Sequence, residues 1–267
     1  MTGKTSLGAP SRAEVFLRLE EEIRTGRAEA GMKLPSEREL AERFGVSRPV
    51  VREAMRGLVE RGLVEVHPGR GAFVRTARAT DAAVGMDALL RRHQPTPRDL
   101  VEARTMLEAT TAALAATRAS IDDLAGIADA LDRFDGASGV IEQARYDLAF
   151  HLAIARAAHN PVVETMFGAI TGLTIELMLR SLADPEVTRA SVPYHHAILT
   201  AIRARHPEEA RTAMTAHLEV AATTYGADFD RSLESVARRE LARLLDPGVT
   251  LEALLASVPD GRGNGER

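Results

Sequence analysis

Hydrophobic positions in the first 60 residues recur at helical spacing in three short segments. In "SRAEVFLRLEEEIRTG", residues 11–26, apolar residues recur every four positions before a glycine. In "LPSERELAERFG", residues 34–45, a Ser-x-x-Glu capping box precedes the apolar positions, and the closing glycine suits the left-handed conformation after a helix. After the turn "GVS" a third helix begins, with its buried stripe at Val51, Ala54, Met55 and Leu58. The pattern predicts three helices, the last two joined by a tight turn.

The next segment changes from helical spacing to alternation. In "GLVEVHPGRGAFV", residues 62–74, Val64 and Val66 alternate with polar neighbours, and "PGRG" is a strong turn signal before a return strand. The pattern predicts a β-hairpin. Its tip carries Arg70 between two glycines, where the backbone can approach a phosphate or a minor groove closely.

Basic residues occupy the free side of the third predicted helix. Arg48, Arg52 and Arg56 recur every four positions opposite the apolar stripe. The second helix of a helix-turn-helix enters the major groove, and arginine can grip guanine O6 and N7 with two hydrogen bonds. Arg38 begins the preceding helix and can add a phosphate contact. A charge run is usually a solvated face, but the capping box, turn, basic face and hairpin in this order favour DNA binding.

The stretch "LPSERELAERFGVSRPVVREAMRGLVERGLVEVHPGRGAFV" resembles the DNA-binding module of GntR-family bacterial transcription regulators. The resemblance implies a winged helix-turn-helix that binds a palindromic operator as a homodimer, most often as a repressor. It also implies that operator DNA is contacted by arginines and by the wing tip, at positions matching Arg38, Ser47, Arg48, Pro49, Arg52, Gly69 and Arg70.

From about residue 97 to residue 225 the apolar positions follow helical stripes, with no strand pattern. Together with high alanine content and 4% aromatic residues, they predict an all-α bundle of six or seven helices. We therefore expect a DNA-binding domain over 10–77, a linker over 78–96, a helical domain over 97–225, and a C-terminal helix with a flexible tail over 226–267.

Four polar residues of the predicted bundle fall on apolar stripes. Asp147 and His151 lie one turn apart with Phe150 and Ile154, so they point inward, where a charge must be paired or bind a metal. His195 and His217 each lie eleven residues from a turn near "ARHPEEA". An antiparallel helix pair would bring both imidazoles to the same height.

A lone inward histidine is usually a satisfied core residue, but the four residues together favour a divalent metal site. The chain has no cysteine, so any metal must be held by His, Asp or Glu. A set of three histidines and one carboxylate suits zinc, nickel, iron or manganese, with zinc as the first expectation.

Arg104 lies among apolar residues in "DLVEARTMLEATTAALAA", residues 99–116. A buried guanidinium needs an anion, which is either Glu108 one turn later or the carboxylate of a bound ligand. This segment, "DLAFHLAIARAAHNP" and the two-histidine hairpin are similar to the metal-containing FCD effector domain of the FadR subfamily. The resemblance implies a small carboxylate effector that coordinates the metal and is held by an arginine matching Arg104.

Composition and charge fit this division. With 267 residues and 45% hydrophobic residues, the chain is expected to be globular; no membrane-spanning run or signal peptide is evident, so we expect a cytoplasmic protein. Residues 11–78 hold 14 Lys and Arg against 11 Asp and Glu, whereas residues 79–267 hold 19 against 27. The imbalance favours a polyanion as the partner of the first part, although chance variation produces similar numbers.

The sequence thus predicts a mainly α protein, with a winged helix-turn-helix followed by an all-α effector domain. Its expected role is that of a ligand-responsive transcription regulator and not an enzyme. Two alternatives remain open: a metalloenzyme built on the three-histidine, one-aspartate centre, and a helical domain whose metal is purely structural.

Overall fold

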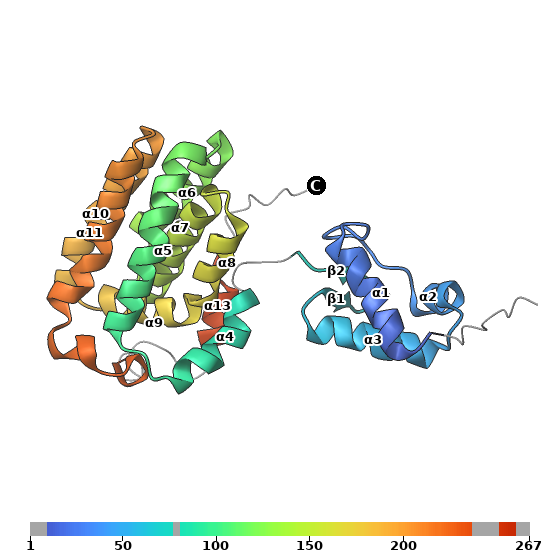
Figure 1. The fold of residues 1–267 in the computed structure, drawn as a ribbon. Helices are drawn as coiled ribbons and strands as arrows, with labels where there is room; N and C mark the ends of the chain where they lie inside the picture. Colours follow the sequence, from blue (N-terminus) through green and yellow to red (C-terminus); the bar gives the residue numbers. More distant parts are fainter. Residues whose placement is uncertain (1–9, 77–80, 237–250, 260–267) are drawn as a thin grey trace, which may run out of the picture. The chain divides into compact units, whose positions relative to one another are not determined.

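The computed structural model describes residues 10–76, 81–236 and 251–259, and it divides the chain into two compact units, Met1–Ala77 and Arg78–Arg267 (Figure 1). The first unit contains helices and a two-stranded sheet; the described part of the second contains helices and no strand. The predicted mainly α class, with a winged helix-turn-helix before a helical domain, is confirmed.

Three helices and one hairpin form the first unit: α1 (Arg12–Arg24), α2 (Glu37–Phe44), α3 (Arg48–Glu60), β1 (Val64–His67) and β2 (Gly71–Val74). The predicted capping box is present at Ser36 and Glu39, and Gly45 ends α2 with φ 66° in the left-handed region. The strands pair antiparallel, with Val64 opposite Val74. Both valines are buried with the apolar faces of the three helices, so the wing and the helix-turn-helix share one core.

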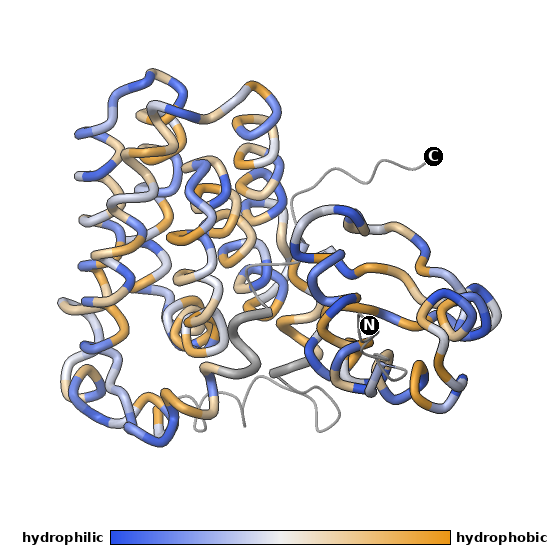
Figure 2. Tube along the Cα trace, turned by 45° about the vertical axis from the view of Figure 1, so that its right-hand side comes forward, coloured by the Kyte–Doolittle hydropathy of each residue, from blue (hydrophilic) through white to orange (hydrophobic). Residues whose placement is uncertain are grey.

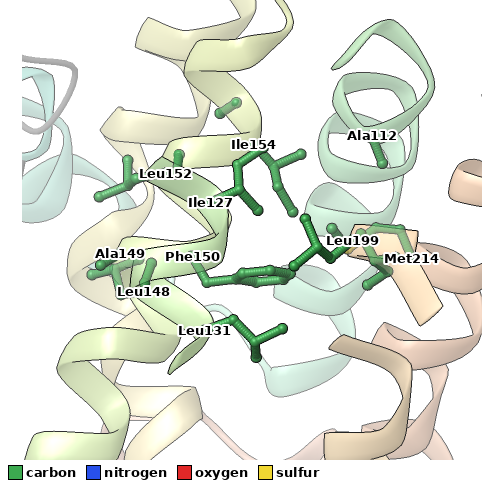
Figure 3. Packing of buried hydrophobic residues seen from close by; sticks show 14 of the residues in the cluster. Ala112, Ile127, Leu131, Leu148, Ala149, Phe150, Leu152, Ile154, Leu199 and Met214 are labelled. Carbon is green, nitrogen blue, oxygen red and sulfur yellow. The ribbon is translucent and has the colours of Figure 1, made fainter. Parts of the chain in front are cut away.

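Seven helices occupy the fully described stretch 97–225, as predicted: α5 (Pro97–Arg118), α6 (Ile121–Gly136), α7 (Val140–Ala157), α8 (Pro161–Ala169), α9 (Thr171–Leu182), α10 (Pro185–Arg203) and α11 (Pro207–Thr224). Helix α11 packs along both α5 and α10, and α6 packs along α7. Hydrophobic and hydrophilic residues alternate along many of these helices (Figure 2). The core lies between them, with Phe150 of α7 at its centre beside Leu131, Leu199 and Met214 (Figure 3).

The segment expected as a linker, 78–96, contains a further helix, α4 (Asp81–Arg92). Helix α4 packs against α8 and α9, and Arg91 forms ion pairs with Asp87 and with the buried Glu176 of α9, at 2.6 Å and 2.5 Å. Its attachment combines the apolar contact of Leu90 with these charged groups, and the charged groups leave no hydrophobic pattern in the sequence.

After α11 come a 3-10 helix, η1 (Gly226–Asp230), and a short helix, α13 (Leu251–Ala256). Leu254 and Val258 are buried in the core of the second unit. Residues 237–250 and 260–267 of the predicted C-terminal helix and tail lie outside the described residues.

Within the described residues no single helix is long and apolar enough to span a membrane. Helices α8 and α9 together reach that length and composition, but they are bent by 61°.

Candidate nucleic-acid interface and metal centre

The recognition surface is the exposed side of α3. Arg48, Arg52 and Arg56 are exposed on this helix, opposite its buried stripe. Ser47 and Pro49 are exposed at its N-terminal end, and within the described residues the Ser47 hydroxyl makes no capping hydrogen bond. Ser47 is the residue directly before α3, as expected from the sequence, but its hydroxyl does not cap the helix.

Glutamates accompany three arginines of this surface. Arg52 forms a two-point contact with Glu37 of α2, with Nη2 3.0 Å from Oε2. Hydrogen bonds from Arg52 are the main reason that the pKa of Glu37 lies below its usual value. Arg38 contacts Glu42, and Arg56 contacts Glu53, each through Nη1.

The wing tip is shaped by glycines and flanked by cations. Gly69 has φ 74°, and the Arg70 guanidinium lies 5.7 Å from the centre of the Phe73 ring. Lys33, which was not among the expected site residues, packs against Gly71, where an added Cβ would lie 2.9 Å from the lysine Cε. Lys33 could have been identified as the basic residue of the strand-like segment "KLP", which directly precedes the capping box of α2.

Asp147, His151, His195 and His217 converge inside the second unit. The first two lie on α7, His195 on α10 and His217 on α11. One candidate ligand atom from each side chain lies within 4.8 Å of the others. All four residues are at most 8% exposed. The antiparallel α10–α11 pair brings the two histidine rings to 4.4 Å between centres, as the equal spacing from the turn predicted.

Several polar atoms of this cluster lack a hydrogen bond. Among the described residues, no hydrogen bond of good geometry is made by the buried atoms Asp147 Oδ1, His151 Nε2, His195 Nδ1 and Nε2, and His217 Nδ1, although His195 Nε2 and His151 Nε2 lie 3.1 Å and 3.4 Å from Asp147 Oδ1. Buried polar groups are rarely left in this state, because each costs free energy without a partner. Imidazole nitrogens and a carboxylate oxygen gathered in this way fit a divalent cation.

The pKa shifts suit a metal at His217 and Asp147. Burial is the main reason that the pKa of His217 lies well below its usual value, so this ring is neutral at pH 7. Burial alone would raise the pKa of Asp147, but His195 and His151 outweigh it and hold that pKa well below its usual value. Neutral imidazole and ionised carboxylate are the forms that bind metals. At His151 burial lowers the pKa, but Glu108 and Asp147 outweigh it and raise that pKa, so a metal would displace a proton from this ring.

Glu108 of α5 connects the cluster to Arg104. Arg104 is 5% exposed, and its Nε lies 2.6 Å from Glu108 Oε1. The other carboxylate oxygen lies against Nδ1 of His151. Glu108 was one of the two partners expected for Arg104, but its contact with His151 could not be expected from the sequence, because a stripe shows which residues point inward and not which helices they meet.

Arg104 is connected to the cluster through Glu108, which contacts both Arg104 Nε and His151 Nδ1. Phe134 and Phe150 approach the His195 ring edge to face, with centres 5.1 Å and 5.2 Å away. The candidate centre therefore has aromatic walls on one side and a buried cation on another.

The remaining histidines with a described contact meet carboxylates at partly exposed positions. His67, His159, His196 and His206 contact Glu65, Asp123, Asp135 and Glu209 respectively. In particular, His196 points away from the cluster, which confirms the assignment of His195 as the inward member of the pair.

Comparisons with known proteins agree with both units. Residues 11–74 match the bacterial regulatory proteins of the gntR family, and residues 99–220 match the FCD domain. The HTH-type transcriptional regulator LutR of Bacillus subtilis is 32% identical over 203 residues, which cover 73% of this chain and 92% of that protein. The "Putative L-lactate dehydrogenase operon regulatory protein" of Escherichia coli is 37% identical over 205 residues, covering 73% of this chain and 79% of that protein.

A solved GntR structure from Streptococcus agalactiae is similar to this chain with a TM-score of 0.64 and 27% sequence identity, and the match covers 80% of this chain and 99% of that one. These similar proteins are transcription regulators, which decides against the metalloenzyme alternative. The chain belongs to the GntR family of transcription regulators, with a GntR DNA-binding domain followed by an FCD domain.

Proposed function

We propose that this regulator binds a palindromic operator as a homodimer and senses a small organic acid at a divalent metal in its FCD domain. The observation that carries the proposal is the buried cluster of converging metal-binding atoms, which Glu108 links to Arg104. A DNA-binding unit joined to such a centre has the parts that a ligand-responsive switch requires.

The proposed DNA contacts lie on the first unit. They are the exposed recognition residues and the wing tip, namely Arg38, Ser47, Arg48, Pro49, Arg52, Gly69 and Arg70. Arginines in the first turns of a recognition helix are placed to reach base edges, whereas those at the helix before it and at the wing reach phosphates or the minor groove.

Asp147, His151, His195 and His217 would hold the metal, and zinc is the ion that we propose first. A bound cation of this kind supplies a Lewis acid that attracts a carboxylate oxygen. The alternatives nickel, iron and manganese share the same ligand preferences.

Arg104 is proposed to hold the second end of the acid. Its Nε edge is occupied by Glu108, and its Nη1 is the nitrogen that Glu108 does not contact. Because the four ligands and Arg104 are buried, an entering acid must displace part of the wall around them. That displacement is the structural change that the DNA-binding unit would sense.

The homodimer is proposed to form through the second unit. Helices α5 and α8 pack against each other and expose Met106, Val162 and Met166, whose exposed fractions are 71%, 66% and 52%. Exposed large apolar side chains on two packed helices offer a surface that a second copy can cover. Since one chain carries one recognition helix, a second copy is the partner that a palindromic operator requires.

The experiment is a thermal-shift screen of small organic acids on the purified protein, with and without prior chelation of metal. L-Lactate is the first acid to test, because the name of the Escherichia coli relative concerns an L-lactate dehydrogenase operon. A stabilising acid should lose its effect after chelation and also in Arg104→Ala. If chelation lowers the melting temperature and no acid in the screen raises it, the metal is structural and the sensing role is wrong.

We propose that the protein represses transcription from the operator and that binding of the acid relieves this repression. A reporter gene placed behind the operator should be expressed more strongly when the acid is added. Expression that depends on the protein and falls in its absence would identify an activator instead.

A further inference from the structure

Arg52 of the recognition helix is held from the side by Glu37, the first residue of α2. Arg52 Nε lies 3.1 Å from Oε1 and 3.2 Å from Oε2 of Glu37, and Nη2 lies 3.0 Å from Oε2. The two residues are 15 positions apart in the chain, so this contact joins the two helices of the helix-turn-helix. The side chain of Glu37 is only 33% exposed, which limits its own freedom to move.

The contact leaves one edge of the guanidinium open. Arginine has five N–H groups, and Glu37 occupies those on the Nε side. The edge formed by Nη1 and the second N–H of Nη2 is not used by Glu37. Two N–H groups on one edge are what a guanine requires for hydrogen bonds to O6 and N7. Glu37 can therefore keep its contact while Arg52 reads a base.

The other glutamate contacts on this surface have a different geometry. Arg38 meets Glu42 through Nη1 at 2.8 Å, and Arg56 meets Glu53 through Nη1 at 3.1 Å. Both are pairs within a single helix, and both use Nη1, the nitrogen that Glu37 leaves open in Arg52. Exposed pairs of this kind are weak and readily exchanged for DNA.

We propose that Glu37 is a positioning residue for sequence recognition: it fixes Arg52 so that the open edge of the guanidinium faces a guanine, without contacting DNA itself. A free arginine must lose side-chain rotations when it binds, and an arginine already held loses fewer. The negative charge of Glu37 also opposes unspecific attraction to phosphates. Both effects favour the correct operator over other DNA. This role rests on the proposed reading of DNA by α3.

The test uses the full-length protein and an operator selected from a random-sequence duplex library by the wild type. Dissociation constants are measured for this operator, for its single-base-pair variants and for an unrelated duplex. In Glu37→Gln, the ratio of specific to unspecific affinity should fall about tenfold, since a well-made arginine–guanine pair accounts for discrimination of this order. The loss should lie at the same base pair at which Arg52→Ala loses discrimination.

Two further variants separate position from charge. Glu37→Asp keeps the charge but shortens the side chain, so it should lose specificity while its affinity for the unrelated duplex stays at the wild-type value. Glu42→Gln, the matched control on the same helix, should change both affinities by the same factor. The double variant Glu37→Gln with Arg52→Ala should discriminate no worse than Arg52→Ala alone.

Undiminished specificity in both Glu37 variants, or a double variant that is worse than Arg52→Ala, overturns the role of Glu37 and leaves the proposed function standing. If Glu37→Gln binds the operator and the unrelated duplex more tightly by the same factor, the positioning role is also overturned. Glu37 would then only weaken the attraction of Arg52 to any DNA. If the wild type selects no sequence at all, the proposed function fails, and this inference fails with it.

Discussion

Replacing Glu108 with glutamine tests the buried connection between Arg104 and the metal centre. Glu108 is 1% exposed, with Oε1 2.6 Å from Arg104 Nε and its other oxygen against His151. Glutamine keeps the shape and removes the charge, which leaves the guanidinium buried without a counter-ion. Breaking a buried pair in this way costs about 3–5 kcal/mol. For a unit of this size each kcal/mol shifts the melting midpoint by about 2–4 °C, so we expect a fall of roughly 6–20 °C.

A second effect should appear in metal binding. Glu108 faces Nδ1 of His151 and so fixes the ring with Nε2 toward the cluster. Loss of such a supporting carboxylate typically weakens metal affinity by about 10–100-fold. Calorimetry on the metal-free protein measures the first effect, and zinc competition against a chromophoric chelator measures the second. Glu102→Gln, an exposed site on the same helix, is the control. If Glu108→Gln has the melting temperature and the zinc affinity of the wild type, the assignment of Glu108 as the partner of both Arg104 and His151 is refuted.

Three other outcomes are expected. Arg48→Ala and Arg52→Ala should each weaken operator binding by at least about tenfold with an unchanged fold, because each removes a potential bidentate base contact; unchanged gel-shift affinity would contradict the DNA assignment. His217→Ala should abolish the stabilisation by zinc, which for the wild type is about 2.7 kcal/mol at a free zinc concentration 100 times the dissociation constant; a full zinc-dependent shift in this variant would remove His217 from the site. Val162→Asp should convert the dimer to a monomer in sedimentation, because the charge would be buried between the two copies; a stable dimer would place the interface elsewhere.

Much of this architecture could be predicted from residue spacing alone. Capping signals located α2 and its end at Gly45, and the helical stripe placed Asp147 and His151 inside. The equal distance of His195 and His217 from one turn was enough to predict that their rings meet, because rise per residue fixes height along an antiparallel pair.

Contacts between helices that are distant in sequence could not be predicted in this way. The contact from Glu108 to His151 joins α5 to α7, and a stripe does not tell which neighbour a buried carboxylate will meet. Helix α4 escaped prediction for a related reason, since its attachment includes the ion pair of Arg91 with Glu176. A charge pair between separate segments leaves no periodic signal in either one.

Arg52 and Arg104 show how one local arrangement serves two different tasks. Each arginine is held by a glutamate at its Nε side, and neither glutamate contacts its Nη1. At Arg52 the guanidinium is exposed, so the pair contributes little to stability and its effect should be confined to recognition. At Arg104 the pair is buried, so the same arrangement supports both the fold and the binding of an acid. Variants at Glu37 should therefore change specificity without changing melting, whereas variants at Glu108 should change melting and binding together.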